Sequence, residues 1–206
     1  NITVYDVQDA LAFDGRIKNR ALFDAILWRN RRQFEDYGRP EQTNRVLHQH
    51  WDPRYTANRV SGERLAVGYF GHPNSFVHWG RVPDVDCFKT DYFRNALGYN
   101  CHLSVRLPGA EHLYKPNCKV STAAACNANL ITTRDASSVE MLGEDYPFYI
   151  ESWELPSLLA GIDKARASFG GPLWREGLDR MREVREETSI ERTIESYLDF
   201  FAEIGG

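Results

Sequence analysis

The sequence predicts an α/β fold, a Rossmann-like parallel sheet with helices on both faces, preceded by a short amino-terminal β-α-β piece. From about residue 64 onwards, short apolar runs alternate with amphipathic stretches, which is the pattern of successive βαβ units. A polar stretch with Ser61 and Gly62 stands before that region and is typical of a linker. We therefore divide the chain into an abbreviated segment, residues 1–60, and a larger domain, residues 61–206.

Composition and charge narrow the class of protein. The 206 residues are 42% hydrophobic and 26% charged, which suits a globular fold with a sizeable core. No apolar run approaches the roughly 20 residues that cross a membrane. A formal charge of -4 disfavours non-specific binding to nucleic acid. The cysteines form no CxxC pair, so we expect buried thiols in a reducing, cytoplasmic compartment. They are Cys87, Cys101, Cys118 and Cys126.

The amino-terminal segment opens with an alternating stretch, residues 1–9, that predicts a strand. Residues 18–37 place apolar side chains on one stripe, which indicates an amphipathic helix ended by Gly38 and Pro40. Three arginines of this helix are expected on its solvated face, and a phosphate or an anionic membrane surface, with the protein bound peripherally, is the alternative. They are Arg29, Arg31 and Arg32.

Residues 45–52 read as a strand, which would put His48, His50 and Asp52 on one face. Two imidazoles and a carboxylate could hold a metal ion, although ligands on a single strand converge poorly. Histidine also titrates near neutral pH and can exchange protons with a substrate. We take His48 and His50 as the candidate catalytic residues and keep a structural role as the alternative.

The larger domain begins with an apolar run, residues 65–70, followed at once by Gly71 and His72. A strand that ends in a glycine turn is the arrangement that opens a nucleotide-binding domain. Residues 87–97 are expected to form a short helix. Residues 101–106 alternate as a strand that ends at Arg106, which we expect to bind an anion.

Residues 115–140 contain most of the features that predict a binding site for a phosphate-bearing ligand. Lys115 and Lys119 flank a proline turn and could present two ammonium groups to a phosphate. A small-residue helix over 120–126 should end at Asn127 or Asn129. Residues 130–133 are expected to form a buried strand, and the polar loop after it leads into another helix, which is where open α/β sheets bind ligands. A strand over 146–150 and three further helices follow, over 154–166, 172–185 and 190–204.

In this order, KPNCK, small-residue helix, LITTRDASSVEML and YPFYIES, the chain resembles the carboxy-terminal, nucleotide-sugar-binding half of GT-B-fold glycosyltransferases over roughly residues 64–206. Many members have a Glu just before the proline and a second Glu further along the helix. Here those positions hold Lys115 and Ala123, which fits the KPxxK subset of the family. The resemblance implies half of a GT-B fold with a much shortened amino-terminal lobe.

The same resemblance implies a function, the transfer of a sugar from a nucleotide-sugar to a glycan, lipid or protein acceptor. Together with the patterns above, it makes these residues donor-site candidates: Gly71, His72, Arg106, Lys115, Lys119, Asp135, Ala136, Ser137, Ser138 and Glu140. Lysine and arginine would neutralise the departing diphosphate, so we expect neither a catalytic metal ion nor another cofactor.

Two other classes of protein are weighed against this one. A dinucleotide-dependent oxidoreductase also uses a strand, a glycine turn and a helix, but the turn at 71–76 lacks the GxGxxG spacing. A non-catalytic nucleotide-sugar-binding or assembly module is favoured more, because so little chain precedes the larger domain. A partner chain, or a second copy in a homo-oligomer, would then supply the missing lobe.

Overall fold

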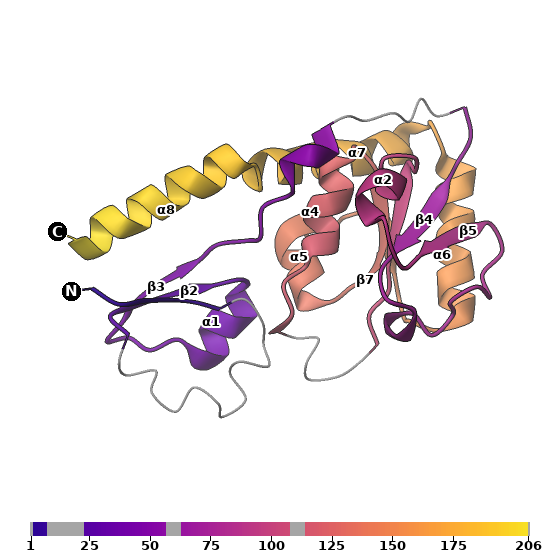
Figure 1. Cartoon of the computed structure of the whole chain (residues 1–206). Helices are drawn as coiled ribbons and strands as arrows, with labels where there is room; N and C mark the ends of the chain where they lie inside the picture. The colour runs from indigo at the N-terminus through magenta and orange to yellow at the C-terminus, as the bar shows by residue number, and fades with distance from the viewer. Residues whose placement is uncertain (1, 8–22, 57–62, 108–113, 206) are drawn as a thin grey trace.

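In the computed structural model, residues 2–7, 23–56, 63–107 and 114–205 are described. They form two parallel sheets, one of three strands in the order β1-β2-β3 and one of five strands in the order β5-β4-β6-β7-β8. Each pairing between neighbouring strands is parallel. Figure 1 shows the two sheets side by side, with helices on both faces of the larger one. The predicted fold class is confirmed. Residues 57–62, where we place the domain boundary, lie outside the described residues.

The smaller sheet contains β1 (Val4–Asp6), β2 (Ala25–Trp28) and β3 (Thr43–Val46), with helix α1 (Arg31–Tyr37) between the last two strands. The predicted first strand is confirmed. The helix predicted over 18–37 is wrong in its centre, because β2 occupies positions 25–28, and residues 18–22 are not described. All four side chains of β2 are buried, on both faces of the sheet, and a strand between two neighbours gives such a run.

The arginine expected on the solvated face at position 29 is in fact buried. Arg29 is 6% exposed, and its guanidinium pairs with Asp6 of β1 and donates to the Tyr197 hydroxyl, 3.1 Å away. A buried cation needs such partners because leaving it unpaired in the interior is costly. Arg31 and Arg32 are exposed, as expected.

The larger sheet contains β4 (Val67–Phe70), β5 (Val85–Phe88), β6 (Cys101–Ser104), β7 (Asn129–Thr133) and β8 (Tyr149–Ile150). Strand β5 is a correction, because residues 87–97 were expected to be helical throughout and only α2 (Tyr92–Ala96) is a helix. This strand lies at the edge of the sheet and is mostly half-exposed, so it lacks the continuous apolar run of β4.

Helices cover the larger sheet, with α4 and α5 on one face and α6 on the other (Figure 1). The helices of this part of the chain are α4 (Cys118–Ala125), α5 (Ala136–Leu142), α6 (Leu155–Ser168), α7 (Pro172–Glu187) and α8 (Ile190–Gly205). Two short 3-10 helices, η3 (Pro53–Thr56) and η4 (Pro73–Ser75), lie in the connecting segments. The small residues of α4 lie fully buried in the main core, which allows close packing against the sheet. The helix ends where Asn127 turns left-handed, with φ 51°, as predicted.

Helix α8 returns across the molecule to the smaller sheet. Its fully buried Phe200 packs with Ala25 and Leu27 of β2, while Arg45 of β3 pairs with Glu203 at 2.7 Å. Figure 1 shows the C-terminus beside the N-terminal strand. The first and last segments of the chain therefore stabilise each other.

None of the helices in the described ranges is long and apolar enough to span a membrane.

The four cysteines are free thiols. Cys101 and Cys126 are buried, as expected, and Cys87 is half-buried. The expectation of burial is wrong for Cys118, which is exposed at the first position of α4. A residue in the first turn of a helix can face the edge of the sheet, where the loops leave room for solvent.

Candidate site at the carboxyl edge of the larger sheet

The candidate donor residues follow the carboxyl ends of three neighbouring strands. Gly71 comes directly after β4, Arg106 after β6 and Asp135 after β7. These strands are adjacent and parallel, so their carboxyl ends share one edge of the sheet. The fold therefore brings together segments that lie up to about sixty residues apart in the sequence.

A cavity of about 290 Å³ opens at this edge. Three of the predicted residues line it: Gly71, His72 and Lys119. The rest of its wall is mostly aromatic or apolar and consists of Tyr55, Phe70, Tyr92, His102, Leu103, Cys118 and Thr122. Clefts of this size with few polar groups are typical of small-molecule sites.

Lys119 is the cation of this cavity. Its Nζ lies 4.0 Å from the centroid of the Tyr69 ring, and it makes no ion pair with a carboxylate anywhere in the described part of the chain. Burial lowers the pKa of Lys119 to about 8, because the apolar surroundings disfavour its charge. A desolvated ammonium without a counter-charge favours an anionic ligand at this position.

The turn after β4 is held by its own backbone. Gly71 N donates to the carbonyl of Phe88 on β5, at 3.1 Å, and Nδ1 of His72 accepts from Asn74 N, at 3.2 Å, so that His72 caps η4. His72 therefore reaches the cavity from a fixed turn. The predicted glycine and histidine both lie at the cavity.

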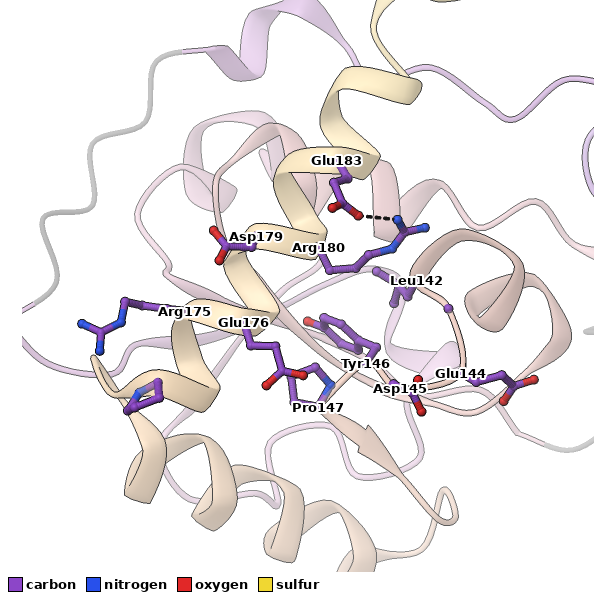
Figure 2. Close-up of a pocket in the computed structure, with 12 residues that line it drawn as sticks. Leu142, Glu144, Asp145, Tyr146, Pro147, Arg175, Glu176, Asp179, Arg180 and Glu183 are labelled. Carbon is purple, nitrogen blue, oxygen red and sulfur yellow. Dashed lines mark hydrogen bonds and ion pairs between the residues drawn. The ribbon is translucent and has the colours of Figure 1, made fainter.

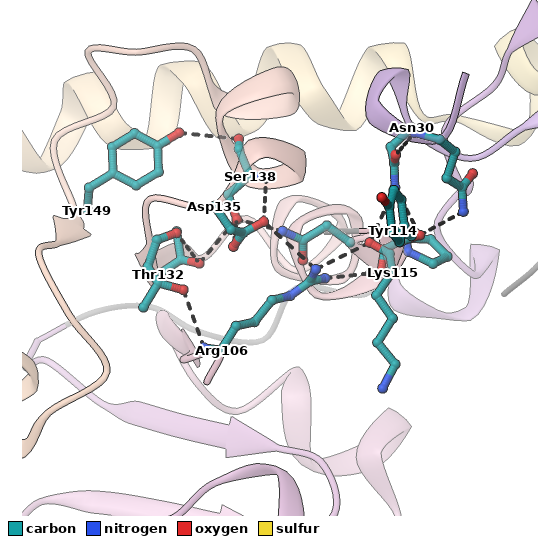
Figure 3. Close-up of polar contacts among 12 residues, drawn as sticks. Asn30, Arg106, Tyr114, Lys115, Thr132, Asp135, Ser138 and Tyr149 are labelled. Atoms are coloured by element: carbon teal, nitrogen blue, oxygen red, sulfur yellow. Dashed lines mark hydrogen bonds and ion pairs between the residues drawn. The ribbon is translucent and has the colours of Figure 1, made fainter. Parts of the chain in front are cut away.

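Arg106 and Lys115 differ in what their side chains do. The guanidinium of Arg106 donates to the carbonyls of Lys115, at 3.2 Å, and Pro116, at 3.1 Å, and lies 3.8 Å from Asp135 (Figure 3). Arg106 thus fastens the proline turn to the start of α5. The Lys115 side chain is exposed and extends away from this cluster (Figure 3).

The loop from Asp135 to Ser138 starts α5. The Asp135 carboxylate caps the helix by accepting from Ser138 N, at 3.0 Å, and from the Ser138 hydroxyl, at 2.8 Å. Asn117 Nδ2 donates to the same hydroxyl at 2.7 Å. Ser137 and Ser138 are buried, and Ala136 is exposed at the first turn. The hydroxyl of Ser138 therefore holds the loop, and the exposed surface here is backbone near Ala136.

Glu140, on α5, contacts the start of α1 and the segment after β3. Both of its carboxylate oxygens accept from the backbone N–H of Arg31, at 3.0 and 2.9 Å, and His48 Nε2 lies 3.4 Å from Oε1. His50 is exposed. Strand β3 ends at Val46, before either histidine, so the predicted common face of the two histidines does not form. Only His48 reaches a donor-site candidate.

Neither possible metal site gathers its ligands. Asp52 lies beside Arg54, whose hydrogen bonds lower the pKa of that carboxyl to about 2. The sequence also contains one Asp-x-Asp pair, Asp84 and Asp86, the usual carboxylate arrangement around a metal-held sugar nucleotide. Those two residues lie at the start of β5, at the opposite edge of the sheet from the cavity. Across the described ranges, no group of three His, Cys, Asp or Glu residues is placed to hold a metal ion.

A second, more open cavity of about 730 Å³ lies between the loop after α5 and helix α7 (Figure 2). None of the predicted site residues lines it. Carboxylates outnumber cations on its wall, and Arg180 there donates to the Met141 carbonyl and pairs with Glu183 at 2.6 Å. Its acidic lining makes it a poor site for a diphosphate.

Several residues of the first cavity were not foreseen. Phe70 and His102 lie on strands whose residue pattern shows which positions are buried, but not that a cavity follows them. His102 is 3% exposed, its Nε2 is 3.1 Å from the Ala96 carbonyl, and burial lowers its pKa to about 4. Burial keeps His102 neutral, so Lys119 supplies the positive charge here.

Comparison with known proteins shows which solved structures share this fold. No family model matches the chain, and no curated protein matches its sequence. Among solved structures, a glycosyltransferase from Rickettsia africae is 11% identical with a TM-score of 0.71, over 98% of this chain and 70% of that one. The chain has the fold of this glycosyltransferase. Anabaena Alr3699/HepE in complex with UDP and glucose is 10% identical, with a TM-score of 0.71 over 98% and 72% of the two chains. Sucrose-phosphate synthase from Thermosynechococcus elongatus is 8% identical, with a TM-score of 0.62 over 98% and 67%.

Proposed function

We propose that the chain binds a nucleotide-sugar at the carboxyl edge of the larger sheet and transfers its sugar to a glycan, lipid or protein acceptor. The observation that carries this proposal is Lys119, a half-buried ammonium without a carboxylate partner among the described residues, in the wall of a 290 Å³ cavity. Such a group stabilises a bound phosphate more than it would in water. The shared fold with glycosyltransferases supports a nucleotide-sugar over other phosphate compounds.

UDP is the first nucleotide to test. Solved structures of the Anabaena protein contain UDP and UDP-glucose. At this identity the likeness concerns the fold, so the base and sugar of this chain's ligand are left to experiment. The aromatic wall of the cavity, with Phe70 and Tyr92, suits a planar ring beside the anion.

Departure of a nucleoside diphosphate builds negative charge on phosphate oxygens, which a metal ion or fixed cations must stabilise. Lys119 in the cavity and the exposed Lys115 on the adjacent turn supply cations, and the first turn of α5 supplies backbone amides. Arg106 holds the proline turn in place by donating hydrogen bonds to the carbonyls of Lys115 and Pro116. We therefore propose transfer without a metal ion or another cofactor.

Glu140 and His48 are assigned to the sugar and the acceptor. The Glu140 carboxylate lies between the donor loop and the smaller sheet, where it can accept from ribose or sugar hydroxyls. His48 is the group beside it that can exchange a proton with an acceptor hydroxyl. A partner chain or a second copy would complete the acceptor side of this site.

Calorimetric titration with UDP tests the proposal. We expect Lys119→Ala to weaken binding by about tenfold or more, because a charge-assisted hydrogen bond is lost. Lys115→Ala should weaken it less, since that side chain is exposed. Lys164→Ala, an exposed lysine of α6 outside the cavity, is the matched control.

The titration is followed by an assay of sugar-nucleotide turnover, with and without candidate acceptors. Binding together with turnover supports a glycosyltransferase. Binding without turnover would make the chain a nucleotide-sugar-binding module, and equal affinities in wild type, Lys119→Ala and Lys164→Ala would remove the basis of the donor site.

A further inference from the structure

Tyr69 lies directly beneath the cavity cation. The residue is fully buried on β4, stacked on Phe76 with ring centroids 4.5 Å apart and packed edge-on against Trp79 at 5.8 Å. Burial raises the pKa of Tyr69 well above its ordinary value, so the hydroxyl stays protonated. Tyr69 therefore offers Lys119 the face of a fixed, neutral ring, to which an ammonium is attracted by the ring quadrupole.

Gly71 leaves the space that this contact needs. A Cβ at position 71 would lie 2.8 Å from the Tyr69 hydroxyl and 3.1 Å from Lys119 Nζ, closer than side chains ordinarily approach. The Tyr69 hydroxyl also lies 3.4 Å from the His72 carbonyl, within the same turn. The glycine turn, the ring and the ammonium thus form one packed unit, and a side chain at position 71 would displace one of them.

We propose that Tyr69 is a positioning residue that holds the Lys119 ammonium in the cavity wall for the phosphate of the ligand, with Gly71 required for that placement. The Tyr69 ring takes the place that a carboxylate usually has as the partner of a half-buried ammonium. An acidic partner would neutralise Lys119 and repel a phosphate, whereas a ring face attracts the ammonium and leaves its charge available to the ligand. This inference rests on the proposed function, because it assigns a role to a residue of the same site.

The arrangement makes anion binding depend on pH. Among the described residues, the titratable and charged groups around Lys119 come from several segments of the chain: Tyr55, Tyr69, His72, Tyr92, His102, Arg106, Lys115 and Cys118. No carboxylate is among them, and Arg106 and Lys115 act with burial to lower the pKa of Lys119 to about 8. The group carries its charge below this pH, so affinity for a phosphate should fall as the pH rises through 8.

Two substitutions at position 69 separate the ring face from the hydroxyl. Tyr69→Phe keeps the face, and Tyr69→Leu removes it. We expect Tyr69→Phe to bind UDP like wild type and Tyr69→Leu to bind it about three- to tenfold more weakly at pH 7. The pKa of Lys119, followed by NMR of protein with labelled lysine, should fall by about one pH unit in Tyr69→Leu, because the ring no longer stabilises the charged form.

Gly71→Ala gives a second route to the same result, since a Cβ at position 71 would crowd both the Tyr69 ring and Lys119 Nζ and so disturb the placement of the ammonium. We expect it to weaken UDP binding by about tenfold while the fold, monitored by circular dichroism, stays intact. The inference is overturned if Tyr69→Leu and Gly71→Ala bind UDP like wild type, or if Tyr69→Leu leaves the Lys119 pKa unchanged. A wild-type protein that binds no UDP or other nucleoside diphosphate would instead defeat the proposed function, while the NMR titration would still report on the ring and the ammonium.

Discussion

His48 Nε2 lies 3.4 Å from Oε1 of Glu140, although His48 follows strand β3 of the smaller sheet and Glu140 lies on helix α5 beside the larger one. The same carboxylate accepts from the backbone N–H of Arg31, so one side chain of α5 contacts both the start of α1 and the segment after β3. This contact places a proton-exchanging group next to a donor-site residue. It also gives a direct test of the role proposed for His48.

We expect His48→Ala to lower the rate of sugar transfer by about a hundredfold, the usual scale for losing a general acid or base. UDP affinity should stay near that of wild type, because His48 contacts Glu140 and does not line the cavity. Steady-state kinetics with a saturating donor separates the two effects. His50→Ala is the matched control, since His50 is exposed. Equal rates in both variants and wild type would exclude a catalytic role for His48.

Cys118 provides a reporter of ligand binding. It is exposed and lines the cavity, whereas Cys101 and Cys126 are buried, so an alkylating reagent should modify Cys118 first. At UDP about ten times above its Kd, some nine-tenths of the protein is occupied, and alkylation should slow by about tenfold. Mass spectrometry of the modified peptides measures this. Alkylation at an undiminished rate would place the nucleotide elsewhere.

Removal of divalent metal should leave the rate of transfer unchanged. The described residues offer no cluster of three metal ligands, and Lys119 already stands where the phosphate charge is expected. The measurement is sugar-nucleotide turnover with excess chelator and again after adding Mg²⁺ or Mn²⁺. Activity that disappears with chelator and returns with metal would show that a metal ion, and not the lysines, stabilises the leaving group.

His102 should make the protein sensitive to acid. Burial lowers its folded-state pKa to about 4, below the ordinary value of 6.5, so the unfolded chain binds the proton more readily between these pH values. Stability is therefore complete above about pH 6.5 and falls as the pH drops towards 4. Between pH 7 and pH 5 we expect His102 to account for about 2 kcal/mol of lost unfolding free energy.

Urea unfolding at the two pH values measures this contribution. His102→Gln can keep a hydrogen bond to the Ala96 carbonyl but cannot take up the proton, so its stability should change less between pH 7 and pH 5. An equal loss in wild type and variant would assign the acid sensitivity to other groups.

Local patterns were sufficient where a segment's burial follows from its own residues. The short runs of β4 and β7 and the alternation of β6, each followed by a polar or glycine turn, predicted strands and hence the edge where Gly71, Arg106 and Asp135 meet. Strands β2 and β5 were missed for opposite reasons. All of β2 is buried, so its apolar run fits a helix as well, and β5 at the edge is too exposed to show a clear run.

The sequence by itself determined the fold class, because strand and helix alternation is set by side-chain periodicity over neighbouring positions. It also determined the stretch that carries the candidate cations. Only the tertiary structure decided which of them lines the cavity, since Lys119 packs over the ring of Tyr69, fifty residues earlier in the chain. Likewise Glu140 meets Arg31 across 109 positions, and α8 closes on the first strands. Such contacts depend on which surfaces the packed elements bring together, and no local pattern contains that information.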